Sequence, residues 1–310
     1  MQKAHSLEKW EHKWGFRFIS PWLIGFFIFY LLPIIVSFIF TFLDFSLSDV
    51  SKISFAGLKN WKRALFEDKE VLASVGRILL FSVINMPISM LFALSVALML
   101  NSRYLLGKRF FRTFFYLPSI IPLVASVIIW QGVLNENTGW INLLIEKIFN
   151  VDATGSDGIR WLANPHLIYV TYTIIGLWGL GNTIIVFLAG LQGIPVELYE
   201  AAEIDGAGGW HSLFRITLPM ITPVVFYNLV IGVIGLMQYF LVPYVINLGS
   251  GFPDGLTNFP MVYFFRQAFT YFNMGYGAVI AWLIFFLGLF FTALLFKTAR
   301  HWVYYAGGDK

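Results

Sequence analysis

Six long apolar segments constrain this chain more than any other feature of its sequence. Each is long enough to cross the apolar core of a bilayer, which takes about 20 helical residues. Backbone groups in lipid are satisfied only in helices or closed barrels, and long unbroken apolar runs are typical of helices. The predicted spans are residues 18–42, 71–100, 110–134, 167–190, 221–247 and 276–297.

The composition agrees with a membrane protein. Hydrophobic residues make up 58% of the 310 residues and charged residues only 12%, whereas a soluble domain carries about 25% charged residues. We therefore predict an all-α, polytopic membrane protein with one domain of six transmembrane helices, residues 18–298. Residues 1–17 and 299–310 are the predicted tails.

Lysine and arginine residues predict the orientation, because they are enriched in the cytoplasmic segments of membrane proteins. They gather in the N-terminal tail, in the loop after the second span and after the sixth span: Lys3, Lys9, Lys13, Arg17, Arg103, Lys108, Arg109, Arg112, Lys297, Arg300 and Lys310. Both termini are therefore expected in the cytoplasm. Loop 44–70 is also rich in lysine. We nevertheless predict it on the outside, together with loops 135–166 and 248–275, because the basic residues of the other segments fit no other orientation.

One polar segment interrupts this apolar pattern. It runs from Glu200 to Pro219, EAAEIDGAGGWHSLFRITLP, in the predicted cytoplasmic loop 191–217. Pro195 suits the first turn of a helix, and acidic residues at 197, 200 and 203 would share one helix face. Glycines at 206, 208 and 209 would then end the helix. We expect a short, stiff helix over about 195–209.

The spacing of this segment resembles the EAA signature of permease subunits of ATP-binding-cassette (ABC) importers. The seven matching residues are Glu200, Ala201, Ala202, Gly206, Ile216, Leu218 and Pro219. In that family the helix seats in a groove on an ATPase subunit. The resemblance implies that ATPase coupling is carried by Glu197, Glu200, Ala201, Ala202, Glu203, Asp205, Gly206 and Ala207.

Other segments resemble the carbohydrate-type branch of these permeases, the maltose and multiple-sugar permeases. They are residues 53–61, 110–130, 139–165 and 268–278. Residues 249–255 depart from that branch, which has a tighter Gly-Gly-Pro there. The resemblance implies a type I ABC importer permease core for a sugar or polyol derivative, in a bacterial plasma (inner) membrane.

The resemblance also implies partners: a second permease subunit that is a homologue by family analogy, two ABC ATPase subunits and an extracytoplasmic solute-binding protein. Membrane lipid surrounds the assembly, which moves solute by alternating access. The sequence shows no G-x-x-x-x-G-K-[ST] phosphate loop, so ATP and Mg²⁺ are expected in the partner ATPases and no cofactor on this chain.

Polar and aromatic residues inside the fourth and fifth spans are candidates for the solute pathway, because polar groups that face lipid are costly. An aromatic face suits the C–H surface of a sugar, and amides suit its hydroxyls. The candidates are Trp178, Asn182, Asn228, Gln238 and Tyr239. Packing between helices is the competing interpretation for each. Arg77, inside the second span near its predicted outer end, is typical of a snorkelling side chain.

Two other functions remain as alternatives. A secondary transporter or channel for a small polar solute would need no ATPase, but the deep spans lack the carboxylates typical of ion coupling. A membrane enzyme would need a catalytic cluster, and no such motif is present. The five histidines have no metal-binding spacing, and no basic cluster interleaved with aromatic residues indicates nucleic acid. We therefore predict a transport subunit that is not itself an enzyme.

Overall fold

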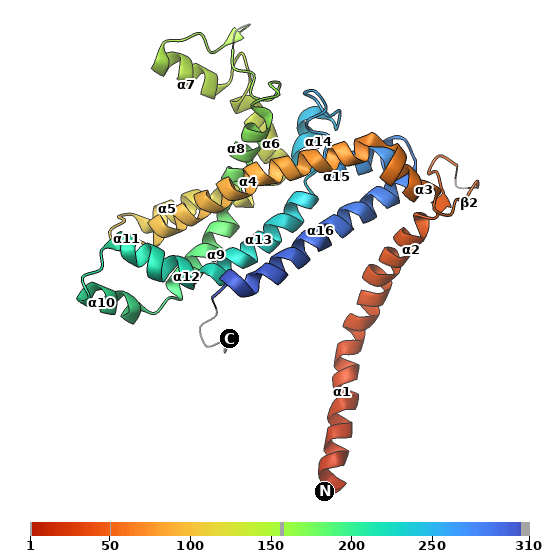
Figure 1. The fold of residues 1–310 in the computed structure, drawn as a ribbon, viewed down its shortest axis with the longest axis horizontal. Helices are drawn as coiled ribbons and strands as arrows, with labels where there is room; N and C mark the ends of the chain where they lie inside the picture. Colours follow the sequence, from red (N-terminus) through yellow and green to blue (C-terminus); the bar gives the residue numbers. More distant parts are fainter. Residues whose placement is uncertain (1, 50, 156–157, 305–310) are drawn as a thin grey trace. The chain divides into compact units, whose positions relative to one another are not determined.

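The computed structural model describes residues 2–49, 51–155 and 158–304 and is built almost entirely of helices (Figure 1). Residues 305–310 of the predicted C-terminal tail lie outside this range. In the described residues, the one sheet pairs two-residue strands, β1 (Leu43–Asp44) and β2 (Ser54–Phe55), in antiparallel register. The all-α prediction is confirmed.

Four helical segments are long and apolar enough to cross a membrane by themselves. They are Trp14–Phe40, Lys69–Asn101, Thr222–Asn247 and Met274–Trp302. Two further candidate spans are bent pairs of helices, with angles of 105° and 62° between their halves. Counting each bent pair as one span gives six among the described residues, in agreement with the sequence prediction. The third and fourth spans are each divided into two helices.

Prolines explain the break in the third span. Helix α5 (Lys108–Tyr116) and a 3₁₀ turn (Leu117–Ile120) precede α6 (Leu123–Val133). Between them, Ile121 has ψ 131°. The residue before a proline is disfavoured in the α conformation, so Pro122 holds Ile121 extended and interrupts the helix.

Glycines mark the break in the fourth span. Helix α8 (Ile168–Trp178) ends at Gly179, and α9 (Gly181–Gln192) begins two residues later. A Cβ on Gly181 would lie 2.8 Å from Ser119 Oγ and 3.0 Å from the Phe115 carbonyl oxygen. Only glycine therefore lets α9 approach the backbone at the end of α5 so closely.

The chain divides into two compact units, Met1–Lys69 with Phe264–Trp282, and Glu70–Tyr263 with Leu283–Lys310. The smaller unit holds α1 (Gln2–Phe26), α2 (Leu32–Phe40) and α3 (Lys59–Lys62), together with the first part of α16 (Met274–Trp302). Three π-helical turns, Phe27–Leu31, Arg63–Glu67 and Arg266–Thr270, also belong to it. Helix α1 begins in the predicted polar tail and continues into the first span.

Close backbone contacts join the two sequence-distant parts of the smaller unit. A Cβ on Gly275 would lie 2.1 Å from the Leu43 carbonyl oxygen. That same carbonyl accepts a 2.9 Å hydrogen bond from the buried Asn60 side chain. Near the end of the first span, Ser37 Oγ accepts a hydrogen bond from Trp282 Nε1 at 3.3 Å. These contacts connect the end of the first span with the start of the sixth.

The larger unit contains the remaining helices. Besides α5, α6, α8 and α9, they are α4 (Lys69–Asn101), α7 (Trp140–Phe149), α10 (Val196–Ile204), α11 (Gly209–Ser212), α12 (Leu218–Met220), α13 (Thr222–Met237), α14 (Leu241–Asn247) and α15 (Pro260–Phe265). A π-helical turn, Leu213–Thr217, joins α11 to α12. Helices α10 and α11 lie together at one end of this unit (Figure 1).

The last turns of α4 take part in a hydrophobic core. Ala93, Ala97 and Leu100 are buried there against Phe187 and Leu191 of α9. Partly buried apolar residues from the segment between α9 and α13 pack on the same core: Tyr199, Ile216, Leu218 and Met220. The polar EAA segment is thus attached directly to the membrane-spanning helices.

Candidate functional site

Helix α10 forms where the EAA signature begins. Pro195 is its N-cap residue, with ψ 131°, and a proline costs no helical hydrogen bond here because an N–H at this position has no partner within the helix. Glu197 lies in the first turn, where a carboxylate interacts favourably with the helix dipole. The helix ends at Ile204, before the end of the predicted range of about 195–209.

A Schellman motif ends α10. Gly206 has φ +78°, and its N–H donates to the Glu203 carbonyl at 3.1 Å, while the Ala207 N–H donates to the Ala202 carbonyl at 2.8 Å. A positive φ suits glycine because it has no Cβ. The signature glycine is therefore needed for a turn, and the predicted role of Gly206 in ending the helix is confirmed.

The polar face of α10 is open to solvent. The four acidic residues of the signature region are exposed, and so is Ala201, while Ala202 and Ala207 are half-buried. The acidic residues are Glu197, Glu200, Glu203 and Asp205. Large apolar side chains beside them are exposed as well: Ile204 by 87% and Trp210 by 76%. Acidic and apolar groups on one exposed surface are typical of a protein-docking site.

A cavity of about 390 Å³ adjoins the turn after α10. Asp205, Gly206, His211 and Arg215 line it, together with neighbouring small residues. The cavity places a carboxylate and a guanidinium beside exposed backbone at the signature glycine. A partner's side chain could therefore enter here with both charge and hydrogen-bonding contacts.

Tyr199 attaches α10 to the segment that leads into the fifth span. Its hydroxyl lies 2.9 Å from the Thr217 hydroxyl, and its ring packs on the core around the end of α4. Thr217 is buried. The sequence analysis did not single out Tyr199, although an aromatic residue inside an acidic helix signals that one face is packed.

The pathway candidates gather at breaks in the helices. Trp178 is the last residue of α8, and Asn182 is in the first turn of α9. Gln238 and Tyr239 lie between α13 and α14. Breaks leave backbone groups free of helix hydrogen bonds, which is characteristic of solute sites in transporters. This clustering was not predicted.

The surroundings of the candidates differ. Trp178 packs edge-to-face on Trp130 of α6, with ring centroids 5.8 Å apart. Asn182 and Gln238 are exposed. Asn228 is buried, and its side-chain amide donates to the Val224 carbonyl of its own helix at 3.0 Å. Trp130, which the sequence analysis did not select, is the nearest aromatic partner of Trp178.

Tyr239 belongs to a buried aromatic cluster. Its ring lies 4.9 Å from Phe81, 6.2 Å from Tyr172 and 5.7 Å from Phe259, measured between centroids. Phe81, Tyr172 and Phe259 are fully buried. Tyr239 therefore connects the break between α13 and α14 with α4, α8 and the chain before α15.

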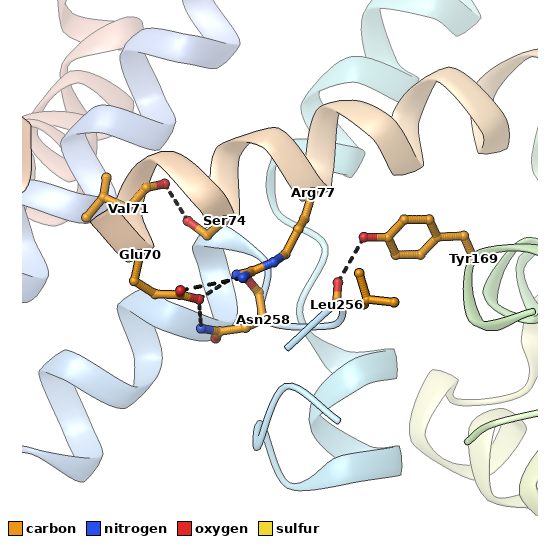
Figure 2. A network of polar contacts seen from close by, with 7 residues as sticks. All are labelled: Glu70, Val71, Ser74, Arg77, Tyr169, Leu256 and Asn258. Atoms are coloured by element: carbon orange, nitrogen blue, oxygen red, sulfur yellow. Dashed lines mark hydrogen bonds and ion pairs between the residues drawn. The ribbon is translucent and has the colours of Figure 1, made fainter. Parts of the chain in front are cut away.

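A polar network lies at the start of α4 (Figure 2). Arg77 forms an ion pair with Glu70 at 2.5 Å, and the same carboxylate accepts a hydrogen bond from the Asn258 amide. The Arg77 side chain is only 20% exposed. Its guanidinium is thus mostly shielded from solvent by Glu70 and Asn258, two partners that the sequence did not predict.

Known proteins resemble this chain over most of its length. The family model for the binding-protein-dependent transport system inner membrane component matches residues 85–301. A probable ABC transporter permease of Bacillus subtilis, YesP, is 36% identical over the whole chain and 97% of its own length. The trehalose/maltose transport system permease MalF of Thermococcus litoralis is 31% identical, over 94% of this chain and 95% of that protein.

The fold also matches a solved structure. One chain of a bacterial ABC transporter involved in the import of the polysaccharide alginate superposes with a TM-score of 0.76, at 22% identity, over 96% of this chain and 98% of that chain. The EAA turn and the bent spans therefore lie in a known membrane fold. The chain belongs to the binding-protein-dependent inner membrane components, the permease subunits of ABC importers.

Proposed function

We propose that this permease forms half of the translocation pathway of an ATP-driven importer for a sugar or oligosaccharide. The pathway opens alternately to the two sides of a bacterial plasma membrane, and both chain termini lie on the cytoplasmic side. The lysine and arginine residues of the tails and of the loop after α4 support this orientation. The function of the trehalose/maltose relative supports a sugar as the solute.

Helix α10 couples this movement to ATP hydrolysis in partner subunits. The observation that carries the proposal is the combination of exposed acidic residues on α10 with the Tyr199–Thr217 contact of the same helix. A helix attached in this way transmits a displacement to α9 and α13 because it is packed on the core at the end of α4. The residues that contact the ATPase are Glu197, Glu200, Ala201, Ala202, Glu203, Asp205, Gly206 and Ala207.

The complete importer contains three kinds of partner. A second, homologous permease subunit forms the other half of the pathway, and two ABC ATPases bind ATP and Mg²⁺ beneath the EAA helices. An extracytoplasmic solute-binding protein delivers the sugar. The family model, defined by dependence on a binding protein, supports the last of these.

Sugar passes beside the helix breaks of the fourth and fifth spans. Trp178 offers its ring to the C–H face of a sugar. The exposed side-chain amides of Asn182 and Gln238 offer hydrogen bonds to its hydroxyls. Tyr239 and Asn228 complete the proposed lining. The breaks at residues 179–180 and 238–240 support this route, since irregular backbone at membrane depth is tolerated where it lines a polar cavity.

Uptake by the reconstituted complex tests the proposal. The importer is purified through a tag on this chain, placed in liposomes and supplied with its binding protein and radiolabelled maltose, trehalose or an oligosaccharide mixture. We expect accumulation of at least one of these sugars only when the ATPase side receives ATP and Mg²⁺. Accumulation of sugar without nucleotide would contradict the proposal. So would a complex that takes up an unrelated solute with ATP but transports none of these sugars.

A further inference from the structure

The segment between α14 and α15, residues 248–259, is called here the outer loop. Its last part is bonded to two charged side chains in the first turns of α4 (Figure 2). Glu70 accepts hydrogen bonds from Arg77 and from the Asn258 amide, both at 2.5 Å. Arg77 also donates to the Asn258 backbone carbonyl at 3.4 Å. The Glu70–Arg77 ion pair thus contacts both the side chain and the backbone of Asn258, which is 181 positions from Arg77 in the sequence.

The outer loop has a second attachment on α8. Tyr169 donates a 3.0 Å hydrogen bond to the Leu256 carbonyl (Figure 2). Inside the loop, Thr257 donates to the Phe252 carbonyl at 2.9 Å. Gly255 lies beside the Arg77 guanidinium and has φ +74°, a backbone conformation that favours glycine. The loop is therefore fixed between α4 and α8.

The outer loop ends in the aromatic cluster that contains a pathway candidate. Phe259 is fully buried, with its ring 5.4 Å from Phe81 and 5.7 Å from Tyr239. Displacing the outer loop would withdraw Phe259 from Tyr239. The position of this loop therefore determines whether the Phe259 ring stays in contact with Tyr239.

The Glu70–Arg77 pair is suited to a contact that forms and breaks. Their side chains are 35% and 20% exposed, so water competes for both charges and the pair is weaker than a fully buried one. Asn258 depends on the same carboxylate, so breaking the pair also weakens the hold on the loop.

We propose that Glu70 and Arg77 are positioning residues that hold the outer loop closed over Tyr239, and that their contacts with Asn258 break when the pathway opens to the outside. This inference rests on the proposed function for its role in transport. The closed loop and its two attachments are independent of that role. Opening exchanges the Asn258 and Leu256 contacts for water, and no covalent step is involved.

The chain contains no cysteine, which allows a direct test of loop opening. Thr257 is 1% exposed, so a Thr257→Cys thiol is protected while the loop is closed. The native complex with this substitution is placed in nanodiscs, and the rate of its reaction with a charged maleimide is measured without nucleotide. We expect Arg77→Gln to raise that rate by about tenfold and Arg77→Lys, which keeps the charge, to raise it less.

Arg160→Gln is the matched control, because Arg160 forms an ion pair with Glu136 at 3.3 Å in a different loop. It should leave the Thr257→Cys rate unchanged. Equal rates with and without Arg77→Gln, or an equal increase with Arg160→Gln, would overturn the proposal. If the Arg77→Gln complex does not assemble, Glu70→Gln replaces it in the test, and we expect the same increase in the Thr257→Cys reaction rate.

Two readouts separate this inference from the proposed function. ATP-driven sugar uptake by the complex tests the function, while thiol reactivity without nucleotide tests the loop contacts. Trapping the native complex with a non-hydrolysable ATP analogue should also raise the Thr257→Cys rate. Uptake with no such increase would overturn the role of the loop and leave the importer function intact.

Discussion

The hydroxyl oxygens of Tyr199 and Thr217 lie 2.9 Å apart and join α10 to the chain segment that enters the fifth span. Thr217 also donates to the Ser212 carbonyl at 3.3 Å. This segment therefore combines two parts: exposed acidic residues and an attachment to the membrane domain through Tyr199. A force on the first part reaches the spans only through the second.

Tyr199→Phe removes this hydrogen bond but keeps the packed ring. We expect a loss of stability of about 1 kcal/mol, because one buried hydroxyl loses its partner. Transport per ATP hydrolysed should fall while the ATPase still binds. Sugar uptake and phosphate release measured together in proteoliposomes check this. An unchanged ratio would mean that the Tyr199–Thr217 contact takes no part in coupling.

Gly206→Ala places a Cβ on a residue with φ +78°. The left-handed conformation costs a non-glycine residue about 1–2 kcal/mol, so the turn after α10 should loosen and ATPase binding should weaken. Gly208→Ala is the control, because Gly208 has φ −73° and no atom within 4 Å of an added Cβ. Affinity of the isolated ATPase for each permease variant, measured by titration, should fall for the first substitution alone.

Trp178→Ala tests the pathway. The loss of the ring should reduce the maximal sugar uptake rate by roughly tenfold if a sugar stacks there, with ATPase attachment intact. Trp22→Ala is a matched control, since Trp22 is 66% exposed on the first span. Equal uptake rates in the two variants would show that Trp178 serves helix packing and does not contact the sugar.

Gly275→Ala should destabilise the smaller unit. The added Cβ would lie 2.1 Å from the Leu43 carbonyl oxygen, so the backbone must move, at a cost of about 2 kcal/mol or more. Gly25→Ala, with no atom within 4 Å of the new Cβ, should have little effect. Thermal unfolding of the two purified variants compares them, and equal midpoints would show that the close approach at Gly275 is absent.

The membrane fold could be predicted because its signals are long. An apolar run of some 20 residues has few possible structures in lipid, and the glycines after α10 have few alternatives to a turn. Gly206 in particular was recognised as a helix end before its φ of +78° was known. Such features depend on residues close together in the sequence.

Features that depend on distant residues could not be predicted in the same way. The contact of Arg77 with the outer loop could not be predicted, because its partner Asn258 is 181 positions away. The 105° bend in the third span is a contrasting case, because Pro122 lies at the bend and a proline inside a span predicts a kink. The role of Tyr199 depends on Thr217, which reaches it only after the chain folds back through α11.

The central claim is that the exposed face of α10 binds the ATPase. The most direct measurement is purification of the tagged chain from membranes, with mass spectrometry of the proteins that accompany it. We expect a second permease and an ABC ATPase to co-purify with the native chain and with Asp152→Lys, the control at another exposed acidic residue. With Glu200→Lys we expect the ATPase to be lost and the second permease to remain. An ATPase that remains bound to the Glu200→Lys permease at native stoichiometry would contradict the account.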